Sequence, residues 1–198
     1  MLTAVGLLLT AFIFEKHFEN YFPLEEGKVL EYSFTSAKDG NVVEKAKVTV
    51  TNLAPKTLDN KTVIPRKYEK VTQKGDKQTY TGFFLNDKEG VLFWAVQGDK
   101  DDQPKPLPQK IYYLKNPLKV AATWGGGEAP KGSIESTDEK VAVAAGSFSG
   151  CVRVKIAYPE NMPLKESLYW FAENVGIIKS SYTYKNGVQE QFELLAVR

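Results

Sequence analysis

Residues 144–158 read AAGSFSGCVRVKIAY, and residues 168–197 read LYWFAENVGIIKSSYTYKNGVQEQFELLAV. In both stretches, short runs rich in Val, Ile, Tyr and Phe alternate with breaks that contain Gly and Asn. β-Branched and aromatic side chains favour strands, whereas Gly and Asn favour the tight turns between strands. The two stretches therefore predict a meander of antiparallel strands.

Apolar and charged residues alternate strictly within several of these runs. Val152, Val154 and Ile156 are separated by Arg153 and Lys155. Because successive side chains of a strand point to opposite faces, such a strand buries one face and exposes the other. This pattern is typical of an antiparallel sheet with one buried face and one solvent-exposed face.

The two-residue period continues through most of the chain after Pro23, which is expected to end the N-terminal helical segment. We predict strands at about 28–36, 42–52, 62–73, 78–85, 91–97, 109–114, 131–137, 139–145, 150–158, 166–173, 176–184 and 188–197. Asn186-Gly187, between two of these runs, is a strong hairpin signal. We predict an all-β fold, with residues 23–198 as a single antiparallel domain and residues 1–22 as an apolar N-terminal segment.

The composition is that of an ordinary globular protein. Of the 198 residues, 42% are hydrophobic and 25% are charged, which suits one domain with a sizeable core. The net charge of +2 arises from 26 basic and 24 acidic residues scattered over both halves of the chain. Nucleic-acid binding requires clustered positive charge, so we expect no nucleic-acid partner.

The single cysteine and the single histidine restrict the chemistry that the chain can perform. Cys151 cannot form an intramolecular disulfide, and any histidine-dependent catalytic or zinc site would have to use His17. We expect Cys151 to pack at the head of a strand and His17 to lie on the surface of a helix. In the glycine-rich run 125–133, the lysine precedes Gly132-Ser133, which is the wrong order for a phosphate-binding loop. We therefore assign no catalytic, metal-binding or cofactor-binding residue.

Residues 2–14, LTAVGLLLTAFIF, form an uncharged apolar run. The run is too short to span a bilayer, which needs about 20 residues. Its length fits the apolar region of a secretory signal, although the positive residues that precede such a region are missing. We favour a periplasmic, membrane-associated or secreted protein, with membrane association through these residues. The open alternative is a helix, continuing to about residue 21, that packs on the sheet of a cytoplasmic protein.

The predicted hairpin over residues 79–97 is apolar on both faces. With a loop at residues 86–90, one face carries five apolar residues: Tyr80, Phe84, Leu92, Trp94 and Val96. In this register Gly82 lies opposite Trp94 and leaves room for its indole ring. Burial of both faces in a sandwich is the more common explanation of such a pattern. A ligand cavity lined by the five residues is the alternative, and they form our candidate binding site.

Four motifs point to a family. They are YFPLEEG at 21–27, PLKVAATW at 117–124, VAVAAGSFSGCVRV at 141–154 and WFAENVGIIK at 170–179. Together they resemble a family of bacterial lipoproteins and secreted proteins of unknown function. The resemblance implies a highly curved antiparallel sheet, a half-open barrel similar to the periplasmic lipoprotein carriers. Phe12 stands where a lipidated cysteine would be expected, which puts a lipid anchor in doubt.

Three functions follow from these observations, in order of preference. The first is a non-enzymatic cell-envelope protein that binds a hydrophobic or lipid-like molecule on the concave face of the sheet. The second is a structural or interaction domain with a fully packed core and no small ligand. The third is an enzyme with a carboxylate or tyrosine site. An internal cavity would separate the first two, and a buried carboxylate with a raised pKa in that cavity would favour the third.

Overall fold

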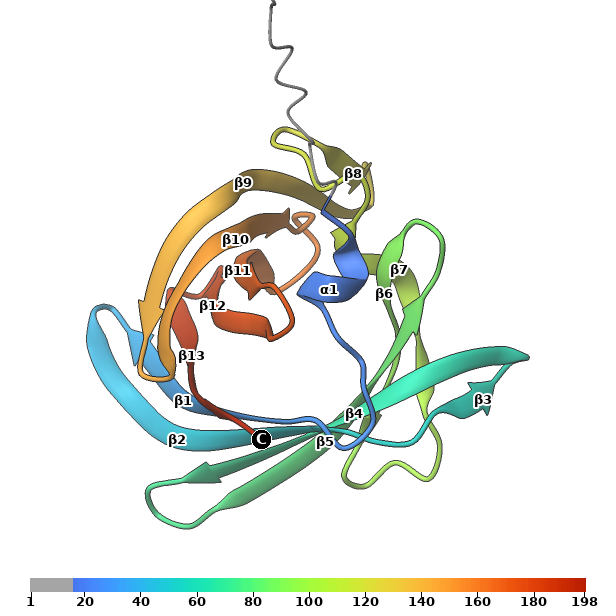
Figure 1. Ribbon diagram of the computed structural model, residues 1–198. Helices are drawn as coiled ribbons and strands as arrows, with labels where there is room; N and C mark the ends of the chain where they lie inside the picture. Colours follow the sequence, from blue (N-terminus) through green and yellow to red (C-terminus); the bar gives the residue numbers. More distant parts are fainter. Residues whose placement is uncertain (1–15) are drawn as a thin grey trace, which may run out of the picture.

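The computed structural model describes residues 16–198, which are almost entirely β-structure (Figure 1). Helix is confined to a single turn, α1 (Phe18–Tyr21). The strands are β1 (Val29–Lys38), β2 (Asn41–Asn52), β3 (Lys56–Leu58), β4 (Lys61–Thr72), β5 (Lys77–Asn86), β6 (Gly90–Gly98), β7 (Lys105–Lys115), β8 (Thr123–Gly126), β9 (Ala129–Val143), β10 (Gly146–Ala157), β11 (Leu164–Ala172), β12 (Gly176–Tyr184) and β13 (Val188–Val197). The all-β prediction is confirmed.

Hydrogen bonds join the strands into one 13-stranded antiparallel sheet. Its order is β7-β6-β5-β4-β2-β1-β13-β12-β11-β10-β9-β8, and β3 pairs with β4 beside this path. The chain therefore builds one half of the sheet from β1 to β7 and the other half from β8 to β13. The halves meet where β13 pairs with β1, with Leu30 opposite Val197 and Lys38 opposite Val188. The sheet does not close, because β7 and β8 remain its two edges.

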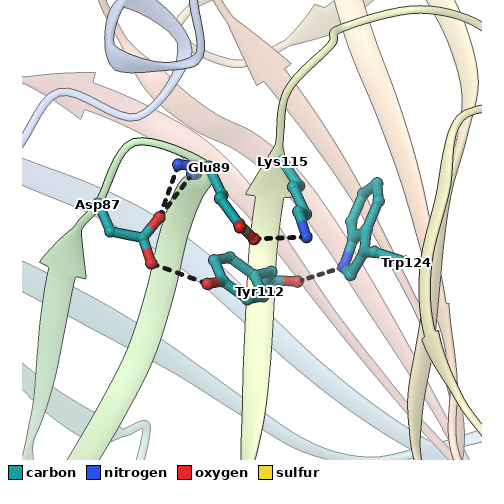
Figure 2. A network of polar contacts seen from close by, with 6 residues as sticks. Asp87, Glu89, Tyr112, Lys115 and Trp124 are labelled. Atoms are coloured by element: carbon teal, nitrogen blue, oxygen red, sulfur yellow. Dashed lines mark hydrogen bonds and ion pairs between the residues drawn. The ribbon is translucent and has the colours of Figure 1, made fainter.

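The predicted strong curvature is also present, and it brings the two edge strands close together (Figure 1). The indole N–H of Trp124 on β8 donates to the backbone carbonyl of Tyr112 on β7, at 3.1 Å. Figure 2 shows that the Tyr112 hydroxyl in turn donates to the Asp87 carboxylate, at 2.8 Å. The other oxygen of Asp87 accepts the backbone N–H groups of Glu89 and Gly90. This chain of hydrogen bonds ties the β5–β6 loop to both edges of the sheet.

The core lies on the concave face, and α1 lies inside the curl of the sheet (Figure 1). Its side chains Phe18 and Tyr21, with Phe22 directly after the helix, are almost fully buried. They pack in the largest core cluster, whose other members are Phe84, Val91, Leu114, Trp124, Ile134, Val152, Val154, Ile156, Tyr169 and Phe171. The α1 segment therefore fills one end of the half-barrel.

Some element boundaries differ from the sequence prediction. Residues predicted as two strands, 131–137 and 139–145, form the single long strand β9. The short strands β3 and β8 were not predicted, and β7 begins at Lys105, within a proline-rich stretch. Proline cannot donate a ladder hydrogen bond, but it is tolerated on an edge strand such as β7.

The structure tests only some of the predictions made for the N-terminal segment. The apolar run 2–14 lies outside the described residues. The helical turn that is described ends at Tyr21, shortly before Pro23, as predicted. His17 is the exposed N-cap residue of α1, which agrees with its prediction as a surface residue.

Candidate ligand-binding site

An aromatic cavity opens on the concave face, beside the part of the core that α1 fills. Its volume is about 60 Å³. The residues that line it come from seven strands: Tyr32, Val50, Arg66, Tyr68, Tyr80, Tyr113, Ile177, Ser180, Tyr182 and Phe192. Five of these residues are tyrosines, so the wall combines apolar ring faces with a few hydroxyl groups.

A groove of about 250 Å³ adjoins this cavity. The two share Tyr68, Tyr80 and Phe192. The remaining groove residues are Phe34, Val48, Lys70, Gln78, Tyr184 and Glu190. The cavity is therefore the inner end of a longer aromatic channel along the concave face.

The mouth of the cavity is formed by a cross-strand pair of tyrosines. Tyr68 on β4 and Tyr80 on β5 are directly paired, and their rings stack with centroids 4.5 Å apart and an interplanar angle of 4°. Tyr80 is 44% exposed. Gly82, two residues further along β5, leaves the space that the inner rings need, because a Cβ there would lie 3.0 Å from Phe93 and 3.1 Å from Phe84.

The opposite wall is formed by Tyr182 on β12 and Phe192 on β13, which contact further rings on β1 and β11. Phe192 contacts Tyr182 at a centroid distance of 5.7 Å and Phe34 at 4.9 Å, both edge to face. Tyr182 in turn meets Tyr169 edge to face, at 5.7 Å. Edge-to-face pairs of this kind are favourable beyond their buried area, so the wall is built of mutually supporting rings.

One charged side chain lies among these rings. Arg66 on β4 is only 3% exposed, and its guanidinium carbon lies 4.7 Å from the centroid of the Phe22 ring and 5.7 Å from that of Phe84. Its Nε has no hydrogen-bond partner among the described residues. A positive charge is thus held at the inner end of the cavity chiefly by ring faces.

The tyrosine hydroxyls of the cavity stay protonated at physiological pH. Burial raises the pKa of Tyr32 and Tyr68, and the nearby positive charge of Arg66 opposes that rise. Burial likewise raises the pKa of Tyr113 and Tyr182. The Tyr32 hydroxyl already donates to the carbonyl of Ile177, at 2.7 Å. The phenols therefore act as neutral hydrogen-bonding groups.

The five residues predicted from the β5–β6 hairpin do not share one face, so that geometric prediction is wrong. Tyr80 lines both the cavity and the groove. Phe84 is buried behind the cavity wall, against Phe22 and Phe93, and Val96 lies opposite Gly82. The ligand contacts proposed for these residues stay a prediction.

The other two residues of the predicted site, Leu92 and Trp94, lie elsewhere. Leu92 pairs with Leu85 rather than with Phe84. Trp94 packs in a separate small cluster with Val63, Phe83 and Ala95, and the ammonium group of Lys61 lies 5.1 Å from its ring.

A bulge and a short loop explain this error in register. The loop between β5 and β6 comprises only residues 87–89, because Asp87 caps it with two backbone hydrogen bonds. The pairing then shifts between Phe83, opposite Ala95, and Phe84, opposite Phe93. Trp94 is the extra residue of this bulge, and a one-residue shift moves side chains to the other face of a strand.

Sequence reasoning missed most of the cavity wall. The residues on β4, β12 and β13 belong to strands that were predicted correctly, but nothing local indicates that β12 and β13 face β4 and β5 across the curl. One signal was available for Arg66: two-residue alternation places it on the same face of its strand as Tyr68. A charged residue on the apolar face of a strand is a feature that requires an explanation.

Comparisons with known proteins give only distant likenesses. No family model and no curated protein sequence matches this chain. A Bacteroides fragilis protein with a YmcC-like fold, thought to be exported, is 16% identical, with a TM-score of 0.47, over 90% of this chain and 98% of its own. A Parabacteroides distasonis protein, thought to be a lipoprotein, is 17% identical with a TM-score of 0.46, over the same shares of the two chains.

A domain thought to belong to an outer membrane lipoprotein-sorting protein of Vibrio parahaemolyticus is 7% identical, with a TM-score of 0.31, over 87% of this chain and 85% of its own. Likenesses this distant do not indicate what the chain binds, and the family suggested by the sequence motifs stays a prediction. Within residues 16–198, no helix has the length and apolar character needed to cross a membrane. The same residues contain no cluster of His, Cys, Asp or Glu side chains that could hold a metal ion.

Proposed function

We propose that this chain is a non-enzymatic cell-envelope protein that binds a hydrophobic or lipid-like molecule on the concave face of its sheet. The observation that carries the proposal is the aromatic cavity of about 60 Å³ that continues into a groove of about 250 Å³. Apolar, concave sites with a few polar groups are the usual form of small-molecule sites, which measure roughly 300–1,000 Å³. The size of this channel suits a single slender apolar chain.

The envelope location is supported by the apolar run 2–14, which has the length of a secretory signal region. If that run is instead a helix that packs on the sheet, the same binding protein would be cytoplasmic. The choice between the two locations leaves the binding proposal unchanged, because the channel is formed entirely by residues after Pro23.

A structural or interaction domain without a small ligand is the second candidate. It is favoured by the way in which Phe18, Tyr21 and Phe22 fill one end of the half-barrel. Binding measurements separate the two candidates, since a fully packed interior offers no saturable site.

The test is a titration of the folded protein with a fluorescent fatty-acid analogue, repeated on two variants. Tyr80→Ala removes an exposed ring from the cavity mouth, and we expect it to weaken binding by about tenfold while leaving the fold intact. Trp94→Ala is the matched control, because it removes a ring from the other side of the same hairpin. We expect this variant to lose stability but to bind the probe as the wild type does.

Two results would contradict the proposal. Absence of saturable binding to the wild type would leave the packed interaction domain as the better description. Binding that Trp94→Ala abolishes and Tyr80→Ala leaves unchanged would place the ligand on the opposite side of the hairpin.

A further inference from the structure

The charge of Arg66 is uncompensated within the described part of the chain. Arg66 is 3% exposed. The ion pairs formed among residues 16–198 do not include it, and its Nε lacks a hydrogen-bond partner there. Buried charges are normally paired, because an unpaired charge loses its hydration without compensation.

The contacts that Arg66 does make cannot replace a counter-ion. The rings of Phe22 and Phe84 attract the guanidinium group through their faces. Ring faces do not satisfy the five N–H donors, which lie in one plane as a fork. The directly paired residue on β2, Asn52, has a buried carbonyl oxygen without a partner among the described residues. An amide oxygen can accept hydrogen bonds, but it carries no charge.

The position of Arg66 makes the two ends of the channel chemically different. Arg66 is 3% exposed and lies against the ring of Phe22, the residue that directly follows α1, whereas Tyr80 at the mouth is 44% exposed. The cavity wall also contains the rings of Tyr68, Tyr113 and Phe192, and the adjoining groove carries further rings together with Lys70, Gln78 and Glu190. An apolar chain with a charged end would therefore find its charge partner inside and its apolar partners toward the mouth.

We infer that Arg66 is the anchor for the anionic head group of an amphiphile, which enters head first and leaves its apolar chain along the aromatic groove. This inference rests on the proposed function, because it concerns the ligand of the same site. The planar guanidinium fork matches the paired oxygens of a carboxylate or a phosphate. The shared chemistry is thus an apolar chain that ends in an anionic oxygen group.

The experiment compares three ligands of equal chain length: decanoate, decyl phosphate and decanol. Each is titrated calorimetrically, below its micelle concentration, into the full chain. The proposal predicts that the wild type binds at least one of the two anions about tenfold or more tightly than decanol, as expected for a charge-assisted hydrogen bond. Preference for decanoate indicates a carboxylate ligand, and preference for decyl phosphate indicates a phosphate ligand.

Two variants test whether the preference for the anion over decanol depends on Arg66. Arg66→Met removes the charge but keeps most of the side-chain volume, and we expect it to lose the preference for the anion over decanol. Lys67→Met is the control: it removes the same charge from the next residue of β4, which is half exposed and pairs with Glu69. This control should keep the preference for the anion within about twofold. Denaturant melts of both variants verify that they are folded.

The possible failures are distinguishable. If decanol binds as tightly as both anions, the inference is wrong and the proposed function stands. If none of the three ligands binds, the proposed function fails and the inference fails with it. If Arg66→Met does not fold, Arg66→Gln replaces it, because it also removes the charge but keeps a polar side chain. A ligand preference unchanged in the folded Arg66 variant would overturn the anchoring role.

Discussion

At the scale of single residues, Cys151 shows how burial lowers the reactivity of a thiol. Its side chain has no exposed surface and belongs to the core cluster that includes Leu30, Val50 and Leu194. Burial raises the pKa of the thiol, and the negative charge of Glu139 raises it further, while Lys16 acts in the opposite direction. Because the thiolate is the reactive form, a raised pKa and a buried sulfur both suppress reactivity.

We therefore predict that a thiol reagent labels Cys151 in the native protein far more slowly than in the denatured protein at pH 7–8. Raising the pH to 9 should accelerate labelling of the native protein by a larger factor than labelling of the denatured protein, because the thiolate fraction of the group with the lower pKa saturates first, while the native protein stays the slower of the two at both pH values. Cys151→Ala should cost about 1 kcal/mol in the free energy of unfolding, as a small buried truncation. Rapid stoichiometric labelling of the native protein at neutral pH would show that the thiol is accessible.

Gly132 is a second residue whose identity is dictated by one neighbour. A Cβ at this position would lie only 2.1–2.4 Å from three atoms of the Trp124 indole. The same indole joins the two edges of the sheet through its hydrogen bond to Tyr112. Any larger residue at position 132 must push the indole away from this contact.

We predict that Gly132→Ala destabilises the protein by roughly 1–3 kcal/mol, as expected for overpacking a tight contact. The control is the same substitution in a Trp124→Leu background, where the clash is absent. There it should cost much less, and the difference between the two costs measures the coupling of the two residues. Equal costs in both backgrounds, measured by urea unfolding, would rule out the indole as the cause.

At the scale of elements, α1 is too short to be stable by itself, because an isolated helix needs about 12–15 residues to be even marginally stable. Its single turn is held by burial of Phe18 and Tyr21 and by the following residue, Phe22. The Phe22 ring contacts Phe84 at 5.3 Å and Phe171 at 6.1 Å. The segment is thus kept in place by the rings of both halves of the sheet.

Phe22→Ala should therefore cost about 3–5 kcal/mol in the free energy of unfolding, the usual range for a large buried ring. The expected cavity would adjoin the aromatic channel, since Phe22 also contacts the Arg66 guanidinium. Phe22→Leu, which refills most of the space, is the control and should recover a large part of the loss. A cost below 1 kcal/mol in denaturant melts would mean that this end of the half-barrel is loosely packed.

Most strands could be predicted from the sequence, because alternation of apolar and polar residues is a local property. The β5–β6 hairpin shows the limit of such reasoning. Its residues were recognised as two strands, but its pairing depends on the bulge at Trp94 and on the loop capped by Asp87. As a one-residue shift exchanges the faces of a strand, Leu92 and Trp94 were assigned to the wrong surface.

At the scale of the whole molecule, the binding channel exists because the two halves of the sheet face each other. Tyr68 and Tyr80 come from the first half, whereas Tyr182 and Phe192 come from the second. The halves are joined by the pairing of β1 with β13, and Trp124 holds their free edges near each other. Curvature brings residues that are more than 100 positions apart in the chain to one cavity.

The sequence by itself determined the class of fold and the inward residues of β10, since each depends on a period that can be read within one strand. Only the tertiary structure decided which strands oppose each other, where the channel lies and that Arg66 stands at its inner end. These features depend on pairing register and on sheet curvature. Both arise from contacts between distant segments, which no local pattern of residues encodes.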